Sequence, residues 1–345
     1  MAKILIVRLG AMGDILHALP AVTSIRAALP DATIGWLVEE RWTNLLAVNG
    51  KKAVVDFIHA VNTQRWRSAF LHPRILREVG AVRRSIRDIR YDIALDFQGA
   101  IKSALFASLT GASVKAGFVN PREPGARFFY SEKFPRLGEH VIEQNFGLTA
   151  QALKKYLGEK KLNLLPPQLP YDPAAEAWAD SEIMRLGIAS FVIMNPGAGW
   201  GAKQWSPVRY GLVAQSLARH NLKTLVNAAG AGEELLADAL IIASNDNAFA
   251  ISCTIAQLIA LTRRARLFIG GDTGPLHLAA ALNIPVVGLY GPTDPARTGP
   301  FGTRAIALRH PDSKTTFSHH RHPDEGLLQI TVDEVVSAAR HLLVS

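Results

Sequence analysis

The chain has 345 residues, with 38 Lys and Arg against 29 Asp and Glu, 48% hydrophobic residues and a single cysteine. This composition excludes a disordered tail, a disulfide-stapled secreted module and a metal-thiolate domain. The length predicts two domains, each large enough to bury its own core. The lone Cys253, and the lack of an apolar run long enough for a membrane span or a signal peptide, favour a cytoplasmic location.

The first half of the sequence alternates short β-branched runs with stretches of helical periodicity. The runs predict strands at 3–8, 33–38, 56–61, 92–97 and 114–118. Helices are predicted at 14–28, 74–90 and 99–109. Strands in regular alternation with helices predict a parallel sheet covered on both faces.

The second half repeats the same pattern. Strands are predicted at 191–195, 224–228, 248–251, 267–270 and 286–290, with helices at 208–220, 233–244, 255–264 and 276–282. Four prolines within 163–174 predict a linker. We therefore expect an α/β fold with one doubly wound domain at 1–165, a second at 166–330, and a terminal helix at 331–345 that Thr331 and Glu334 begin as a capping box.

A glycine-containing turn follows the first predicted strand, at Leu9 to Asp14. Its glycines allow a ligand to approach backbone amides at a helix start, although the full dinucleotide fingerprint is absent and Glu39 and Glu40 support it only weakly. Asp14 at that helix start is either a cap or a carboxylate that accepts a proton from a bound hydroxyl.

Two glycine-rich turns follow predicted strands of the second half. The first, NPGAGWGAKQWSP at 195–207, places Lys203 beside three glycines and is either a phosphate cradle or a flexible surface loop. In the second, Asp272, Thr273 and Gly274 precede a helix that carries His277. A helix start of this kind favours an anion, with Asp272 better suited to sugar hydroxyls; the alternative is a capped helix with a buried histidine.

Weaker signals lie elsewhere in the second half. Glu233 is either a ribose ligand or a residue favoured by the helix dipole. His319, His320 and His322 suggest a metal only faintly, since they match no helical ligand spacing. We expect chemistry without a metal ion or cofactor.

Three segments together resemble glycosyltransferase family 9, the ADP-heptose lipopolysaccharide heptosyltransferases. They are KILIVRLGAMGDILHALPAV at the start, NPGAGWGAKQW in the middle, and GGDTGPLHLAAALNIPVVGLYGPTDP near the end. Arg65-Trp66-Arg67 and Arg122-Glu123-Pro124 are similar to the type I enzymes in particular. The resemblance implies a GT-B fold, in which two Rossmann-like domains face a cleft and the C-terminal helix crosses back to the first domain.

The resemblance also implies a reaction. Heptose would pass from ADP-heptose to the Kdo residue of Kdo-lipid A with inversion, in lipopolysaccharide inner-core biosynthesis. Asp14 would act as the general base, and Lys203 would stabilise the departing diphosphate. The residues implied for the donor are Gly199, Lys203, Glu233, Cys253, Asp272, Thr273, Gly274 and His277, with Cys253 near adenine. Those implied for the acceptor are Gly13, Arg65, Arg67, Lys102 and Arg122.

The excess positive charge lies in the first half. Residues 1–165 contain 24 Lys and Arg against 14 Asp and Glu, whereas 166–345 contain 14 against 15. An acceptor that bears carboxylates and phosphates would complement this charge, and so would the anionic cytoplasmic face of the inner membrane, where we expect a peripheral enzyme.

Three other functions remain open at this point. A type II heptosyltransferase would use an already heptosylated core. A non-catalytic nucleic-acid-binding protein would use the basic half, although no recognised module or aromatic platform supports it, and we expect no nucleic-acid partner. An NAD oxidoreductase would use the Rossmann-like repeats.

Overall fold

The structure, a computed structural model, describes residues 1–48, 50–68, 72–228, 232–316 and 322–344. The chain forms two compact units, Met1–Pro170 and Tyr171–Ser345. The division between them falls within the proline-rich segment, just before Asp172 caps the first helix of the second unit. Each unit contains its own sheet and is described separately.

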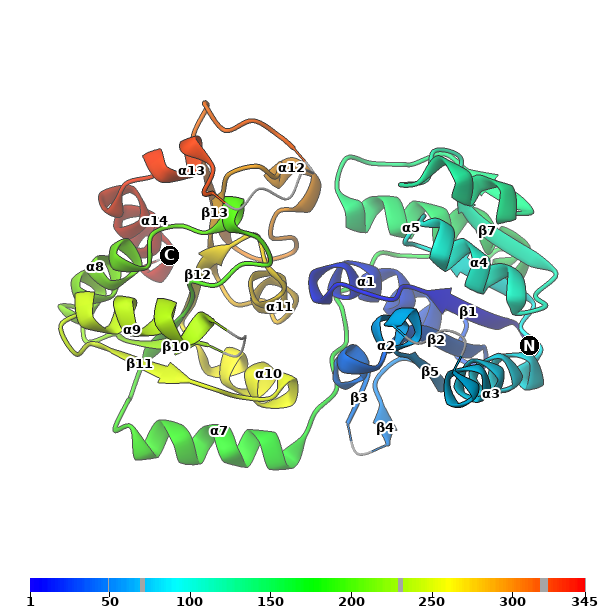
Figure 1. Ribbon diagram of the computed structural model, residues 1–345, viewed down its shortest axis with the longest axis horizontal. Helices are drawn as coiled ribbons and strands as arrows, with labels where there is room; N and C mark the ends of the chain where they lie inside the picture. The colour runs from blue at the N-terminus through cyan, green and yellow to red at the C-terminus, as the bar shows by residue number, and fades with distance from the viewer. Residues whose placement is uncertain (49, 69–71, 229–231, 317–321, 345) are drawn as a thin grey trace. The chain divides into compact units, whose positions relative to one another are not determined.

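The described part of the first unit is built on a six-stranded parallel sheet in the order β5-β2-β1-β6-β7-β8 (Figure 1). Its strands are β1 (Lys3–Val7), β2 (Thr33–Glu39), β5 (Phe57–Val61), β6 (Ile93–Asp96), β7 (Val114–Phe118) and β8 (Glu132–Phe134), with β3 (Ala47–Val48) and β4 (Lys51–Lys52) as a separate antiparallel pair. Its helices are α1 (Met12–Ala28), α2 (Thr63–Ser68), α3 (Pro73–Ile89), α4 (Ile101–Leu109), α5 (Val141–Ala152) and α6 (Lys154–Leu157), with the 3-10 turns η1 (Glu40–Leu45) and η2 (Pro124–Phe129).

Apolar side chains on both faces of this sheet explain the helical layers. One face shares a core with α2, α3 and α4, where Trp66, Ile86 and Ala107 pack on strand residues such as Val7. Helix α1 packs against α5, which also contacts β6, β7 and β8, and α1 buries side chains such as Ile15. The hydrophobic effect therefore holds helices against both faces, as parallel sheets require.

The described part of the second unit repeats this plan, with a six-stranded parallel sheet in the order β11-β10-β9-β12-β13-β14 (Figure 1). Its strands are β9 (Phe191–Asn195), β10 (Lys223–Asn227), β11 (Ala248–Ile251), β12 (Leu267–Gly271), β13 (Val286–Tyr290) and β14 (Ala305–Arg309). Its helices are α7 (Pro173–Arg185), α8 (Pro207–Ala218), α9 (Glu233–Ala243), α10 (Ile255–Arg264), α11 (Gly274–Ala281), α12 (Pro295–Thr298), α13 (Glu325–Gln329) and α14 (Val332–Val344), with the turn η3 (Gly201–Lys203).

Two separate cores cover the faces of the second sheet. Helices α8, α9 and α14 pack on one face, and α7, α10 and α11 pack on the other. Helix α14 contributes Val335, Ala339 and Leu342 to the first of these cores. It is thus an integral part of the second unit, and its expected return to the first domain stays a prediction.

Both sheets have the strand order of a Rossmann fold. Numbered within each unit, the order is 3-2-1-4-5-6, so the direction of winding reverses between β1 and β6 in the first unit and between β9 and β12 in the second. Neighbouring loops diverge to opposite faces at such a reversal, which leaves a crevice at the carboxyl ends of the strands. Residues after β1, β6, β9 and β12 are therefore the first candidates for a site.

The structure contains strands that the sequence pattern did not predict, and one predicted helix begins at a different residue. Strands β8 and β14 were not predicted, because each is an edge strand with several exposed residues and lacks a long apolar run. Helix α4 begins at Ile101 rather than at residue 99, since Gly99 adopts a φ of +65° that a helix does not accommodate. Across the described residues, no helix is both long and apolar enough to span a bilayer.

Candidate active-site residues at the two strand-order reversals

The carboxyl end of β1 presents Asp14 on the first turn of α1. One carboxylate oxygen, Oδ1, lies 2.5 Å from Arg8 Nη2, and the other, Oδ2, accepts a hydrogen bond from the Ala11 amide at 3.0 Å. The side chain of Asp14 is 39% exposed, whereas that of Arg8 is 9% exposed. Asp14 therefore does assist the helix start, and it also presents part of its carboxylate to solvent, as a general base must.

Arg8 fixes this carboxylate to the neighbouring strand. Its Nη1 donates to the Phe97 carbonyl at 2.8 Å, directly after β6. The backbone of Leu9 joins the same turn by donating to Gln98 Oε1 at 3.0 Å. Sequence reasoning did not single out Arg8; a basic residue that ends an otherwise apolar strand six positions before the candidate base was the available signal.

A buried carboxylate organises the turn after β6. Asp96 accepts hydrogen bonds from Tyr130 Oη at 2.7 Å, Ser103 Oγ at 2.8 Å and the amides of Gln98 and Gly99 at 2.8 and 3.2 Å. Burial raises the pKa of Asp96, and these four donors oppose that shift. The network gives Phe97 and Gln98, the partners of Arg8 and Leu9, a rigid support.

Three of the expected acceptor residues lie on two helices of the first unit, α2 and α4. Lys102, in the first turn of α4, donates to Thr63 Oγ1 at 2.8 Å and so joins α4 to the start of α2. Arg65 and Arg67 are exposed on α2. The Arg65 guanidinium pairs with the Glu78 carboxylate on α3 at 2.7 Å.

Two further expected acceptor residues lie next to the strand-order reversal. Gly13 occupies the first turn of α1, where backbone amides have no carbonyl partner within the helix. Arg122 lies close in space to the turn at Gly99. A Cβ at Gly99 would lie 3.0 Å from the Arg122 amide nitrogen, and the next residue, Glu123, donates its amide to the Gly99 carbonyl at 2.9 Å. Both residues therefore lie near the carboxyl ends of β1 and β6, where the strand order reverses.

Three linked polar side chains occupy the reversal in the second unit; Asp272 and His277 are buried and Lys203 is partly buried. Lys203, at the end of η3, places its Nζ 2.6 Å from Asp272 Oδ2, and His277 Nε2 lies 2.8 Å from Asp272 Oδ1. Burial alone would raise the pKa of Asp272, but His277 and Lys203 hold it well below its usual value. The carboxylate stays ionised and aligns both partners.

The start of α11 lies beside these three side chains. Thr273 has extended backbone at the N-cap and donates its hydroxyl to the Gly271 carbonyl at 3.3 Å, and Gly274 begins the helix. Gly199 lies in the loop after β9 with open space where a Cβ would be. Lys203 and the amides that begin α11 thus offer positive charge and hydrogen-bond donors at one place, which suits a phosphate group.

Glu233 packs against the glycine loop that follows β9. A Cβ on Gly197 would collide with Glu233 Oε1, so an alanine at this position would force the carboxylate to move. Gly197 belongs to the NPGAGWGAKQW segment, but the sequence pattern predicts no separate role for it. The structure brings Glu233, the first residue of α9, to the loop that carries Gly199 and Lys203.

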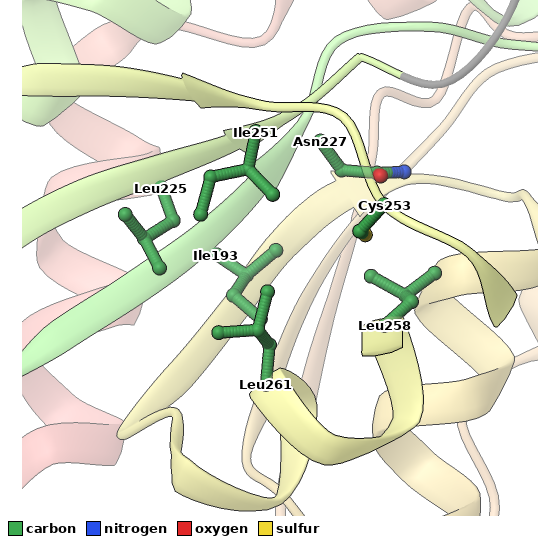
Figure 2. A pocket seen from close by; sticks show the side chains of 7 residues that line it. All are labelled: Ile193, Leu225, Asn227, Ile251, Cys253, Leu258 and Leu261. Carbon is green, nitrogen blue, oxygen red and sulfur yellow. The ribbon is translucent and has the colours of Figure 1, made fainter. Parts of the chain in front are cut away.

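Cys253 lines a small, largely apolar pocket next to this loop (Figure 2). The pocket encloses about 190 Å³ of empty space, part of it open to solvent, and its other walls are Ile193, Leu225, Asn227, Ile251, Leu258 and Leu261. Burial raises the pKa of the Cys253 thiol to about 12, so the thiol is neutral and forms part of the apolar wall.

One polar atom in this pocket is buried without a hydrogen bond in the described structure, namely Asn227 Oδ1. Asn227 Nδ2 donates to Asn195 Oδ1 at 2.7 Å, and Asn195 in turn donates to the Gly197 carbonyl at 2.8 Å. The two asparagines end neighbouring strands β10 and β9, and an asparagine at the end of each predicted strand was the available signal in the sequence.

The weak metal signal gains no support here. His319 and His320 lie outside the described residues, and nearby Asp324 caps α13 by accepting the Leu327 amide at 2.9 Å. Within the described ranges, no group of three or more metal-ligating side chains comes together.

Comparison with known protein families decides the class of this chain. Residues 79–326 match the family described as "Glycosyltransferase family 9 (heptosyltransferase)". The chain belongs to this family. The prediction of family 9 is confirmed, and so is the prediction of a glycosyltransferase enzyme.

Individual relatives of this family 9 chain agree with the assignment. Lipopolysaccharide heptosyltransferase 1 of Pseudomonas aeruginosa is 28% identical over 309 residues, which cover 89% of this chain and 83% of that protein. Lipopolysaccharide heptosyltransferase 2 of Escherichia coli is 27% identical over 294 residues, which cover 77% of this chain and 80% of that protein.

Solved structures support the predicted fold. The structure of the E. coli heptosyltransferase WaaC with ADP aligns with a TM-score of 0.79 at 24% sequence identity, over 99% of each chain. The predicted GT-B class of two Rossmann-like sheets is thereby confirmed. Because the chain belongs to a glycosyltransferase family, this assignment replaces the nucleic-acid-binding and oxidoreductase alternatives.

Proposed function

We propose that the protein is an inverting, metal-independent heptosyltransferase of type I. It transfers L-glycero-D-manno-heptose from ADP-heptose to the Kdo residue of Kdo-lipid A in lipopolysaccharide inner-core biosynthesis. The observation that carries the proposal is the set of contacts that joins Lys203, Asp272 and His277 beside the start of α11, in a protein of glycosyltransferase family 9. Its similarity to lipopolysaccharide heptosyltransferase 1 of P. aeruginosa supports the choice of acceptor.

The donor binds to the second unit. The diphosphate lies against Lys203 and the amides of Thr273 and Gly274, because a lysine and a helix start together provide the positive charge that a metal ion supplies in other transferases. Asp272 holds heptose hydroxyls while keeping Lys203 and His277 aligned.

The nucleoside part of the donor binds beside the glycine loop that follows β9, near Glu233 and Cys253. Glu233 accepts hydrogen bonds from ribose hydroxyls, and the loop around Gly199 leaves room for the ligand. Adenine takes the apolar wall formed around Cys253, where Asn227 Oδ1 offers a buried acceptor for its exocyclic amine.

The reaction is a single displacement. The Kdo hydroxyl oxygen attacks the anomeric carbon of heptose, the bond from that carbon to the phosphate oxygen breaks, and its electron pair leaves with ADP. Asp14 takes the hydroxyl proton, and Arg8 holds the carboxylate in place for this step. Attack opposite to the leaving group inverts the anomeric carbon.

The acceptor binds to the first unit, whose excess of basic residues attracts its carboxylates and phosphates. Arg65, Arg67, Lys102 and Arg122 contact these anionic groups, and Gly13 leaves space beside the base. Guanidinium groups suit such contacts because they bind carboxylate and phosphate in a bidentate manner. The carboxylate of the acceptor takes the place of Glu78 on Arg65. The enzyme works as a peripheral protein at the cytoplasmic face of the inner membrane.

A transfer assay with two acceptors tests the proposal. Purified protein, ADP-heptose and either Kdo-lipid A or heptosylated core are incubated with and without a chelator, and the product is analysed by mass spectrometry and NMR. We expect transfer to Kdo-lipid A with an inverted anomeric centre and no loss of rate with chelator. Transfer to heptosylated core alone would identify a type II enzyme, and chelator sensitivity would refute the metal-independent mechanism.

A further inference from the structure

Helix α4 exposes a stripe of large apolar side chains. Ile101, Leu105 and Leu109 are 45%, 44% and 38% exposed, and their spacing of four residues places them along one side of the helix. The other side of the helix packs against the rest of the unit, where Ala104 and Ala107 are fully buried. A surface helix normally presents polar residues to water, so the stripe calls for a binding partner.

A fourth exposed apolar side chain lies in the turn that packs along α4. Phe128, in the turn η2, is 78% exposed. The turn packs along α4, since a Cβ on Gly125 would lie 2.9 Å from Ile101 Cδ1 and Ala126 shares a small core with Ala104. We call Ile101, Leu105, Leu109 and Phe128 the α4 patch.

Basic side chains border the α4 patch. The Arg127 guanidinium lies over the Phe128 ring at 5.1 Å, and Arg87 of α3 donates its Nε to the Leu109 carbonyl at 3.3 Å. The first unit as a whole contains 24 Lys and Arg against 14 Asp and Glu. Exposed Leu, Ile and Phe bordered by arginine match a surface that has negative headgroups above an apolar interior.

We propose that the α4 patch docks onto the surface of an anionic lipid bilayer. The inference rests on the proposed function, in which the acceptor is itself a lipid held in that bilayer. Helix α4 begins directly after the turn that follows β6, and Lys102 lies in its first turn. Docking through this helix therefore brings Lys102, one of the expected acceptor residues, to the level of the lipid headgroups.

The second unit provides a matched control surface. On α8, Val208 and Leu212 are 50% and 42% exposed, with the same spacing of four residues as the α4 stripe. This unit contains 14 Lys and Arg against 15 Asp and Glu, so it lacks the excess positive charge. We expect Val208 and Leu212 to make no contribution to membrane binding.

Vesicle cosedimentation of the full chain tests the inference. The vesicles are phosphatidylcholine alone, or phosphatidylcholine with about one-third phosphatidylglycerol. The variants are Leu105→Asp/Phe128→Asp and the control Val208→Asp/Leu212→Asp, with circular dichroism and thermal unfolding to verify the fold. Transfer to a soluble, Kdo-terminated acceptor without acyl chains provides a separate measure of the proposed function.

We expect the wild-type protein to bind the anionic vesicles in preference to the neutral ones. The Leu105→Asp/Phe128→Asp variant should lose roughly tenfold in partitioning, since two apolar anchors are replaced by two repelled charges. The control variant should bind like wild type, and both variants should keep transfer to the soluble acceptor.

Three results would overturn the inference. They are equal binding of wild type and Leu105→Asp/Phe128→Asp, equal loss in the control variant, or a dimer in light scattering that only the α4 variant abolishes. The last result would make the patch an interface between two copies. Failure of the wild-type protein to bind anionic vesicles, together with normal transfer to the soluble acceptor, refutes the docking surface alone. Normal vesicle binding by the wild-type protein without any transfer refutes the proposed function alone.

Discussion

Replacing Asp14 by asparagine separates the catalytic role of this residue from its role at the helix start. Asparagine keeps a side-chain oxygen that accepts the Ala11 amide, which Asp14 Oδ2 now accepts at 3.0 Å. It removes the proton acceptor and the charge. The expected loss in kcat is roughly 10²–10⁴-fold, equivalent to about 3–5 kcal/mol of activation free energy. ADP-heptose affinity should stay unchanged, because the proposed donor residues lie in the second unit.

The effect on stability should be much smaller. Asp14→Asn breaks the ion pair with Arg8, whose atoms are 2.5 Å apart. Breaking a fully buried pair costs about 3–5 kcal/mol, but the Asp14 side chain is 39% exposed, so solvent screening should reduce the cost to about 1 kcal/mol. A typical domain is stable by about 5–15 kcal/mol, and the variant should therefore remain folded at the assay temperature.

The assay compares kcat, donor Kd and thermal unfolding for wild type, Asp14→Asn and a control at another helix start. Asp172→Asn is the matched control, because Asp172 Oδ1 accepts the Ala174 amide at 3.0 Å at the start of α7. We expect this control to retain its kcat. If Asp14→Asn were folded and turned over at a near-normal rate, Asp14 would be a helix-start residue only and the base would have to be sought elsewhere.

Three further predictions concern the donor site and the first core. Lys203→Ala should weaken ADP-heptose binding and slow transfer, because it removes the positive charge beside the diphosphate and leaves buried Asp272 with His277 as its partner; an unchanged calorimetric donor titration would exclude Lys203 from the site. Gly197→Ala should raise donor Kd, because the new Cβ would collide with the Glu233 carboxylate and push it out of its position. Glu233→Ala should remove most of this extra penalty in the double variant, and additive losses would contradict the reasoning. His59 is buried and its pKa is lowered to about 4 by burial, so an unfolded chain binds more protons between pH 6.5 and 4. The free energy of unfolding should fall by about 3 kcal/mol as pH drops through this window. Urea unfolding at several pH values should show that the unfolding free energy of His59→Gln depends less steeply on pH than that of wild type, and an equal pH dependence would refute the assignment.

The sequence by itself determined the class of the fold and the places where chemistry occurs. Apolar strands in alternation with helices require two parallel sheets, because each strand must bury both faces. Glycine-rich turns after strands marked Asp14, Lys203 and Asp272, and the three motifs identified the family. These features are local, since they depend on residues a few positions apart. The edge strands β8 and β14 were not predicted, because their residues are exposed or half-buried and form no clear apolar pattern in the sequence.

Tertiary structure alone decided which of these residues meet. Strand order places β9 beside β12, and this brings Lys203 to Asp272 across 69 positions of sequence. The neighbouring strands β1 and β6 likewise join Arg8 to the Phe97 carbonyl and so hold Asp14, while Glu233 comes to rest against Gly197. Strand order results from the packing of whole layers, and a local pattern contains no information about it. The chemistry of each residue was therefore legible in the sequence, whereas its partners were fixed by the way the sheets are wound.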